Sequence, residues 1–190
     1  MSSLHSIRRV LRKAAVPVVG AALAFSITVT IATPAAASGS YSGRAYVYGG
    51  GEVNDDFDDE GVVNVTTHRY SNVACLWQTI LWAHGYLPSS GIDGIFGDQT
   101  DAATRKFQAD KGLAVDGSAG RNSWTKAGDR IRQLDNQNGW LFVVYYGVTG
   151  ARSSYSAHEF VLQRSPDGNY RFYPPQDGGP YWASYNSRTC

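Results

Sequence analysis

A stripe of hydrophobic side chains runs through residues 72–85, NVACLWQTILWAHG. Its members recur at the spacing i, i+3, i+4, i+7, i+8 and i+11, which places them on one face of a helix. They are Val73, Leu76, Trp77, Ile80, Leu81 and His84. Ser71 or Asn72 can cap the start of such a helix, and Gly85 can end it. The pattern therefore predicts an amphipathic helix over this stretch.

Two further helices are predicted downstream, each with a shorter apolar face. The first covers residues 99–111. Its shared face consists of Thr100, Ala103 and Phe107. The second is expected to begin near Arg121 and to bury Trp124. The same spacing extends this helix through Ile131 and Leu134.

From residue 136 onward the chain changes to the two-residue alternation of β-strands. The strand-like runs are residues 140–146, 160–164 and 170–173. Between the last two, the sequence SPDGN at residues 165–169 predicts a hairpin, because proline followed by Asp-Gly favours a tight turn. We therefore expect an α+β fold, in which a three-helix bundle (residues 71–135) packs with a C-terminal antiparallel β unit (residues 136–190).

Aromatic residues are concentrated in this β unit, with twelve between residues 140 and 190. The favoured interpretation is that a small sheet needs large side chains to bury enough surface. Alternatively, exposed tyrosines and tryptophans could stack on sugar rings, because they combine an apolar face with a polar tip. In Tyr145-Tyr146 and Tyr181-Trp182, one member of each pair is free to face outward.

Two loops of the helical region share one pattern. Residues 93–100, DGIFGDQT, and residues 116–123, DGSAGRNS, both read D-G-x-x-G-x-x-[T/S] and lie 23 residues apart. Asp-Gly favours a turn with a positive φ at the glycine, and the second glycine permits a tight entry into a helix. Each copy therefore predicts a turn that leads into a helix.

The spacing of these residues over 72–127 resembles the peptidoglycan-binding domain, a small three-helix module appended to many bacterial cell-wall hydrolases. The matching positions are Val73, Leu76, Ile80, Gly85, Tyr86, Ile92–Gly97, Thr100, Ala103, Phe107, Gln108, Gly112, Leu113, Val115–Gly117, Gly120, Ser123 and Trp124. The resemblance implies a three-helix bundle and a cell-wall ligand, either glycan or stem peptide. The layout also resembles secreted actinobacterial proteins, whereas the C-terminal segment resembles no domain that we recognise.

The ligand face of such a module should include side chains carried by loops, because binding groups gather on loops held by a rigid scaffold. The candidate ligand-binding residues are Tyr86, Asp93, Phe96, Gln99, Arg105 and Gln108. For Asp93 the alternative is a role in the turn alone. Trp124 is interpreted as a core residue.

The first 37 residues have the layout of an export signal. Residues 1–13 carry four cations and no acid, residues 14–31 carry no charge, and Ala35-Ala36-Ala37 provides a small-residue cleavage site. The alternative is a membrane anchor, since 18 uncharged residues are just long enough to span a bilayer. We expect cleavage near Ser38 and a protein that is secreted or held at the cell wall, with no membrane segment after cleavage.

Without these 37 residues the chain has 13 basic and 16 acidic side chains and is therefore mildly acidic. Proteins that bind nucleic acid carry basic surfaces, so nucleic acid is not an expected partner. The acids are most concentrated in the run DDFDDE at residues 55–60. Calcium-binding loops place their acids at alternating positions and contain a glycine for the turn, and the run at residues 55–60 has neither feature. We therefore expect a solvated acidic loop within a polar N-terminal segment, residues 38–70.

Cys75 and Cys190 are the two cysteines of the chain. In an oxidising compartment an even number of cysteines favours a disulfide, with two unpaired thiols as the alternative. A Cys75–Cys190 bond would hold the C-terminal tail against the first helix and make the helical and β parts one body.

The sequence predicts no catalytic or metal centre and no cofactor. The histidines beyond residue 37 are His68, His84 and His158, without the spacing of a zinc site. Glycoside hydrolysis needs two carboxyl groups, and the C-terminal candidates are Glu159 with Asp167 or Asp177. The favoured interpretation is that these are surface acids beside a hairpin, without a catalytic role.

Three functional hypotheses follow from the sequence. The first is a secreted, non-catalytic protein that binds peptidoglycan through the helical region. The second is a small cell-wall hydrolase whose catalytic unit lies in residues 136–190. The third is a protein-interaction module that has lost its wall ligand.

Overall fold

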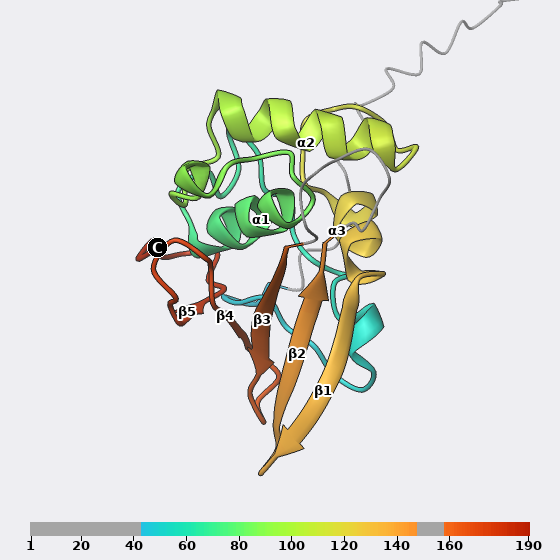
Figure 1. The fold of residues 1–190 in the computed structure, drawn as a ribbon, viewed down its shortest axis with the longest axis vertical. Coiled ribbons are helices and arrows are strands. Elements are labelled where there is room, and N and C mark those ends of the chain that lie inside the picture. Colours follow the sequence, from blue (N-terminus) through green and yellow to red (C-terminus); the bar gives the residue numbers. More distant parts are fainter. Residues whose placement is uncertain (1–42, 148–157) are drawn as a thin grey trace, which may run out of the picture. The chain divides into compact units, whose positions relative to one another are not determined.

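Three helices and a five-stranded antiparallel sheet form the described part of the chain, residues 43–147 and 158–190 of a computed structural model (Figure 1). The helices are α1 (Asn72–Ala83), α2 (Asp98–Asp110) and α3 (Arg121–Gly128), with 3-10 turns η1 (Val53–Asp55) and η2 (Ser89–Gly91). The strands are β1 (Ile131–Gln137), β2 (Trp140–Tyr146), β3 (Glu159–Arg164), β4 (Tyr170–Phe172) and β5 (Tyr181–Trp182). The predicted α+β fold class is confirmed.

The predicted export signal, residues 1–37, lies outside the described residues. All described residues belong to one unit of the chain, residues 35–190. Among them, no helix combines the length and the apolar character needed to cross a membrane.

Helix α1 is buried almost all round. The Ser71 hydroxyl accepts a hydrogen bond from the Ala74 amide at 3.0 Å and caps the helix start. After the helix, Gly85 has a φ of 74°, a left-handed conformation that glycine adopts without strain. Every residue of α1 except Trp82 is buried, which is typical of a helix in the centre of a core.

Contacts at both ends of α1 connect the helices to the sheet. Asn72 Nδ2 donates to the carbonyl oxygen of Trp182 in β5 at 2.9 Å. Beyond the other end, His84 Nε2 lies 2.7 Å from the Tyr145 hydroxyl in β2. Burial lowers the pKa of His84 to about 3, so the imidazole is neutral and acts in packing. One hydrophobic cluster runs through the helices and the inner face of the sheet.

The strands follow one another across the sheet in the order β1-β2-β3-β4-β5. Val143, Leu162 and Phe172 are partners in adjacent strands and are fully buried on the inner face. In the turn between β3 and β4, the Ser165 amide donates to the Asn169 carbonyl at 2.9 Å. The hairpin predicted from the SPDGN sequence is confirmed.

The expected continuation of the third helix through Ile131 and Leu134 is wrong. Helix α3 ends at Gly128, and strand β1 begins at Ile131, which pairs with Tyr145 of β2. Ile131 is fully buried and Leu134 is 61% exposed, so the two do not share an apolar face. Pairing with an apolar neighbouring strand outweighs the local helical spacing.

The prediction of a solvated acidic loop is wrong for Asp56. This carboxylate is 4% exposed and accepts a hydrogen bond from Arg164 Nη1 of β3 at 2.6 Å. The Tyr170 hydroxyl of β4 donates to the same oxygen. Burial raises the pKa of Asp56, and these two partners oppose that rise. Both partners of Asp56 belong to the sheet and lie more than 100 residues later in the chain, so its burial follows from tertiary contacts.

Glu60 is the second acid of the run that lies in the interior. It is 3% exposed, and it accepts hydrogen bonds from the Tyr48 amide at 3.0 Å and from the Tyr185 hydroxyl. Burial raises its pKa to about 8. Asp55 and Asp59 of the same run are exposed, as expected of a solvated loop.

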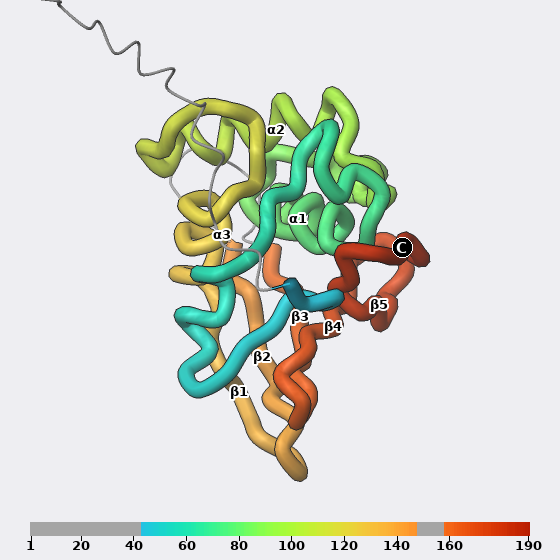
Figure 2. Tube along the Cα trace, turned by 180° about the vertical axis from the view of Figure 1, so that it is seen from behind, coloured from blue at the N-terminus to red at the C-terminus, as the bar shows by residue number. Residues whose placement is uncertain are grey.

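The C-terminal tail lies against the start of α1 (Figure 2). Cys75 and Cys190 form a disulfide across 115 residues of sequence. Asn72 Oδ1 also accepts hydrogen bonds from the amides of Thr189 at 2.8 Å and Cys190 at 3.1 Å. The disulfide predicted from the cysteines is confirmed, and hydrogen bonds to Asn72 also hold the tail.

Candidate functional site

The two repeated loops each fold around a buried glutamine. The first DG loop is residues 93–100, and Gln78 of α1 supplies its glutamine. Gln78 Oε1 accepts hydrogen bonds from the amides of Asp93 at 3.0 Å and Gly94 at 2.8 Å. Its Nε2 donates to Asp93 Oδ1, the Ile95 carbonyl and Thr100 Oγ1 at 2.8–3.0 Å. One side chain thus connects both ends of the loop, Asp93–Ile95 and Thr100.

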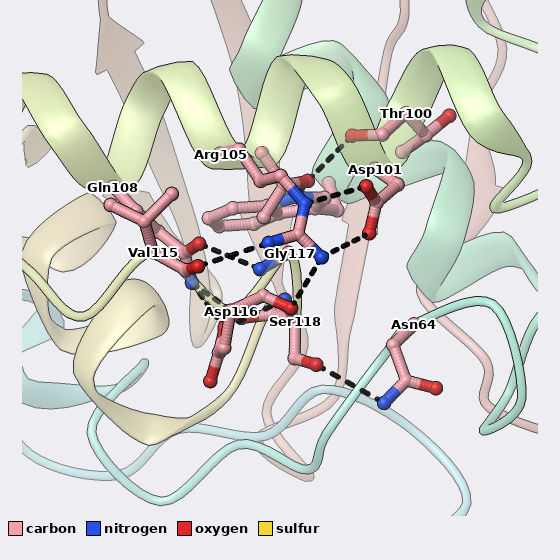
Figure 3. A network of polar contacts seen from close by, with 11 residues as sticks. Asn64, Thr100, Asp101, Arg105, Gln108, Val115, Asp116, Gly117 and Ser118 are labelled. Atoms are coloured by element: carbon pink, nitrogen blue, oxygen red, sulfur yellow. Dashed lines mark hydrogen bonds and ion pairs between the residues drawn. The ribbon is translucent and has the colours of Figure 1, made fainter.

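Gln108 of α2 does the same in the second DG loop, residues 116–123 (Figure 3). Its Oε1 accepts a hydrogen bond from the Gly117 amide at 2.9 Å. Its Nε2 contacts Asp116 Oδ1 at 2.7 Å, the Ser118 carbonyl at 3.0 Å and Ser123 Oγ at 3.3 Å. These are the same pattern positions that Gln78 contacts, so the sequence repeat is also a structural repeat.

Residues 63–70 lie alongside both DG loops and connect them. The Val63 and Ala119 backbones exchange two hydrogen bonds of 3.0 Å at the second loop. At the first loop, the Phe96 amide donates to the Arg69 carbonyl at 2.8 Å. Phe96 and Ala119 occupy the same position in the repeated pattern. One stretch of chain therefore holds the two loops in a fixed relation.

Arg105 of α2 fastens the second DG loop to the helix (Figure 3). Its Nε lies 2.8 Å from Asp101 Oδ2, and this partner raises the pKa of Arg105. Its Nη1 and Nη2 donate to the carbonyls of Val115 and Asp116, each at 3.0 Å. Gly117 has a φ of 75°, and a Cβ at that position would come within 2.1 Å of Asp101. The left-handed backbone at this position therefore favours glycine, and the ends of the Asp101 and Arg105 side chains occupy the space where a Cβ would lie.

Two of the six candidate ligand-binding residues lie in the interior. Phe96 is fully buried, and Gln108 is 2% exposed. Asp93 is exposed, and its Oδ1 shapes the turn by accepting the Ile95 amide at 2.9 Å. Trp124 is fully buried and donates from Nε1 to the Gly61 carbonyl at 3.0 Å, which agrees with its interpretation as core.

The other three candidates reach the surface, all beside α2. Gln99 is exposed in the first turn of the helix, directly after the first DG loop. Arg105 is exposed two turns later, and its side chain is 45% accessible. Tyr86 is partly buried, and its hydroxyl donates to Asp110 Oδ2 at the helix end at 2.7 Å. Burial and Asp110 together raise the pKa of Tyr86, so the hydroxyl keeps its proton.

The family model described as a putative peptidoglycan binding domain matches residues 75–126. The helical region is similar to the peptidoglycan-binding domain. The match covers most of α1, both DG loops, α2 and most of α3, and it supports peptidoglycan binding in general. No curated protein and no solved structure matches the chain. The disulfide and the peptidoglycan-binding-like module are together consistent with an extracellular or cell-wall location.

The acids considered for glycoside hydrolysis do not form a close pair at β3. Glu159 begins this strand, and Asp167 follows its other end. Six residues of strand span roughly 17 Å, whereas two catalytic carboxyl groups lie about 5–10 Å apart. Asp177 instead accepts the Tyr181 hydroxyl at 2.5 Å. Among residues 43–147 and 158–190, no group of His, Cys, Asp or Glu could hold a metal ion.

The sequence pattern did not reveal the part that Gln78 plays. It lies 15 residues before Asp93, whereas Gln108 lies 8 residues before Asp116. Because the two offsets differ, the repeat of the loops does not extend to the glutamines. The available signal was a polar side chain on a helix that is otherwise apolar nearly all round.

Proposed function

We propose that this is a secreted, non-catalytic protein that binds peptidoglycan through its peptidoglycan-binding-like module, residues 75–126. The family match is the single observation that carries the proposal. The structure supports it with two DG loops that are held rigidly by buried glutamines and by residues 63–70. Rigid loops bind with a low entropic cost, because they need little ordering when the ligand arrives.

The proposed ligand surface is the exposed edge of the first DG loop and α2. Asp93, Gln99, Arg105 and Tyr86 present polar groups there, suited to the amides, hydroxyls and carboxylates of a wall fragment. Phe96 and Gln108, which are buried, support this surface from beneath. Among the exposed candidates, Gln99 is the best position to mutate, because its side chain forms no hydrogen bond with any described residue.

Binding to whole cell-wall sacculi tests the proposal. We expect the secreted protein to sediment with purified sacculi and to release no soluble wall fragments. Gln99→Ala should lower the bound fraction several-fold without loss of stability, since the side chain is exposed.

The matched control is Gln133→Ala, which removes an exposed glutamine from β1 on the sheet. It should bind sacculi like the unaltered protein. A protein left wholly in the supernatant would contradict the proposal. Release of soluble fragments that is lost in Glu159→Gln would instead support a hydrolase.

A further inference from the structure

A row of side chains crosses the outer face of the sheet, away from the helices. Phe142, Gln163, Arg171 and Trp182 are successive partners in β2, β3, β4 and β5. Paired residues of neighbouring strands point to the same face, and their neighbours along each strand point to the other. Trp140 lies two residues before Phe142 and therefore shares this outer face.

Three aromatic rings and one cation on this face form what we call the aromatic platform: Tyr46, Trp140, Arg171 and Trp182. The ring centres of Trp182 lie 6.2 Å from Trp140 and 6.0 Å from Tyr46. The Arg171 guanidinium lies 4.4 Å from the centre of the Trp140 ring and 6.0 Å from that of Trp182. The platform thus joins β2, β4, β5 and the N-terminal segment.

Arg171 of the platform is held in place by Gln163, its partner in the neighbouring strand β3. Arg171 Nε donates to Gln163 Oε1 at 2.6 Å, and the Tyr173 hydroxyl donates to the same oxygen at 2.7 Å. Gln163 is 6% exposed, so this anchor is shielded from water. Side chains fixed in this way lose little freedom when a ligand binds.

A surface pocket of about 310 Å³ opens beside the platform. Tyr46, Trp140 and Trp182 line one part of it, and the β3–β4 turn lines the rest with Ser165, Pro166, Asp167 and Asn169. Trp182 is 40% exposed, which is unusual for a side chain of its size. Pockets of about 300 Å³ and above are of the size that small ligands occupy.

We propose that the aromatic platform binds a saccharide, namely an amino-sugar segment of the wall glycan strand. A pyranose ring has an apolar face of C–H groups, which fits an exposed indole, and hydroxyls at its rim. The carboxylate, amide and hydroxyl of Asp167, Asn169 and Ser165 supply hydrogen-bond partners for that rim. The choice of glycan rests on the proposed function, since the glycan strand is a component of the peptidoglycan that the protein is proposed to bind.

Tryptophan indole signals in an NMR titration test the proposal on the secreted protein. The probe is the β-1,4-linked trimer of N-acetylglucosamine. We expect the indole N–H signals of Trp140 and Trp182 to shift and saturate. The indole signals of Trp77 and Trp124 should not shift, because both rings are buried. Trp77 Nε1 donates to Thr104 Oγ1, and Trp124 Nε1 donates to the Gly61 carbonyl. Absence of saturable shifts at millimolar trimer would overturn the proposal.

Variants separate ring stacking from a general effect on the fold. Trp182→Ala should weaken trimer binding by about tenfold, and Trp182→Phe should retain most of the affinity. Tyr70→Ala is the matched control, because it removes an aromatic ring that is 60% exposed near the first DG loop. Unchanged trimer affinity in Trp182→Ala would refute the platform as the site.

The two proposals can fail independently. If Gln99→Ala lowers sacculus binding and the trimer causes no shift, the module binds the wall and the platform inference is wrong. If the trimer shifts Trp140 and Trp182 but Gln99→Ala sediments like the unaltered protein, the platform is a saccharide site and the proposed surface on α2 is wrong.

Discussion

Replacing both Cys75 and Cys190 by alanine should lower the free energy of unfolding by about 4–5 kcal/mol, the stabilisation expected for a bond that closes a loop of more than 100 residues. The bond stabilises the fold mainly because it restricts the unfolded chain. Cys75 is fully buried in α1, and alanine is smaller than cysteine, so the substitution introduces no steric clash. Urea unfolding of the unaltered protein and the double variant, followed by circular dichroism, measures the difference.

Reduction provides the control for the disulfide prediction. A reducing agent should lower the stability of the unaltered protein to that of the double variant and leave the double variant unchanged. The hydrogen bonds of Asn72 to Thr189 and Cys190 remain possible in both. Two free thiols in the unaltered protein under oxidising conditions, or a loss of stability below about 1 kcal/mol in the double variant, would contradict the account.

Glu60 should make the protein less stable as the pH rises from about 4.5 to about 8. In the unfolded chain this carboxyl titrates near its ordinary pKa of 4.5, whereas in the fold burial raises its pKa to about 8. Between these values the folded state holds a proton that the unfolded state has lost, so stability falls with rising pH and levels off above pH 8. At about 1.4 kcal/mol per pH unit, the fall is on the order of 3–5 kcal/mol.

Glu60→Gln removes this titration and keeps hydrogen-bonding atoms for the Tyr48 amide and the Tyr185 hydroxyl. The variant and the unaltered protein should be similarly stable at pH 4.5, and the variant should be the more stable at pH 8.5. Glu52→Gln is the matched control, an exposed glutamate of the same segment. A stability difference between Glu60→Gln and the unaltered protein that stays constant from pH 4.5 to 8.5 would refute the prediction.

Helices α1 and α2, the start of α3 and the β3–β4 hairpin could be predicted from sequence because their determinants are local. The apolar spacing of residues 72–85 fits α1. The turn at Asp167-Gly168 follows from the local preference of this dipeptide, with a positive φ at Gly168. The disulfide was predictable for another reason, since Cys75 and Cys190 offer one pairing.

The inward-facing acids and β1 could not be predicted because their partners are distant in sequence. Asp56 is separated from Arg164 by 108 residues, and Glu60 from Tyr185 by 125. A run of acids is solvated unless such partners meet it, and one sequence does not show which of them will. Leu134 followed a helical spacing by coincidence. It lies in β1 where the pairing with β2 shifts register between Gln133 and Asp135, and that pairing depends on a neighbouring strand.

For the candidate site, the sequence predicted the loops better than the side chains that support them. The DG pattern located both turns, because Gly94 and Gly117 need a positive φ. Gln78 was missed, and Gln108 was expected at the surface, whereas both support the loops from the interior. Burial of a polar side chain depends on tertiary contacts, which the spacing of the motif does not contain.

The central claim is that the helical module contacts peptidoglycan, and an NMR titration of the protein with a soluble disaccharide-peptide fragment tests it most directly. The account predicts saturable shifts of backbone amides in the first DG loop and the first turn of α2, and of the Gln99 side-chain amide. The absence of any saturable shift within residues 75–126, at fragment concentrations high enough to displace the protein from sacculi, would contradict it.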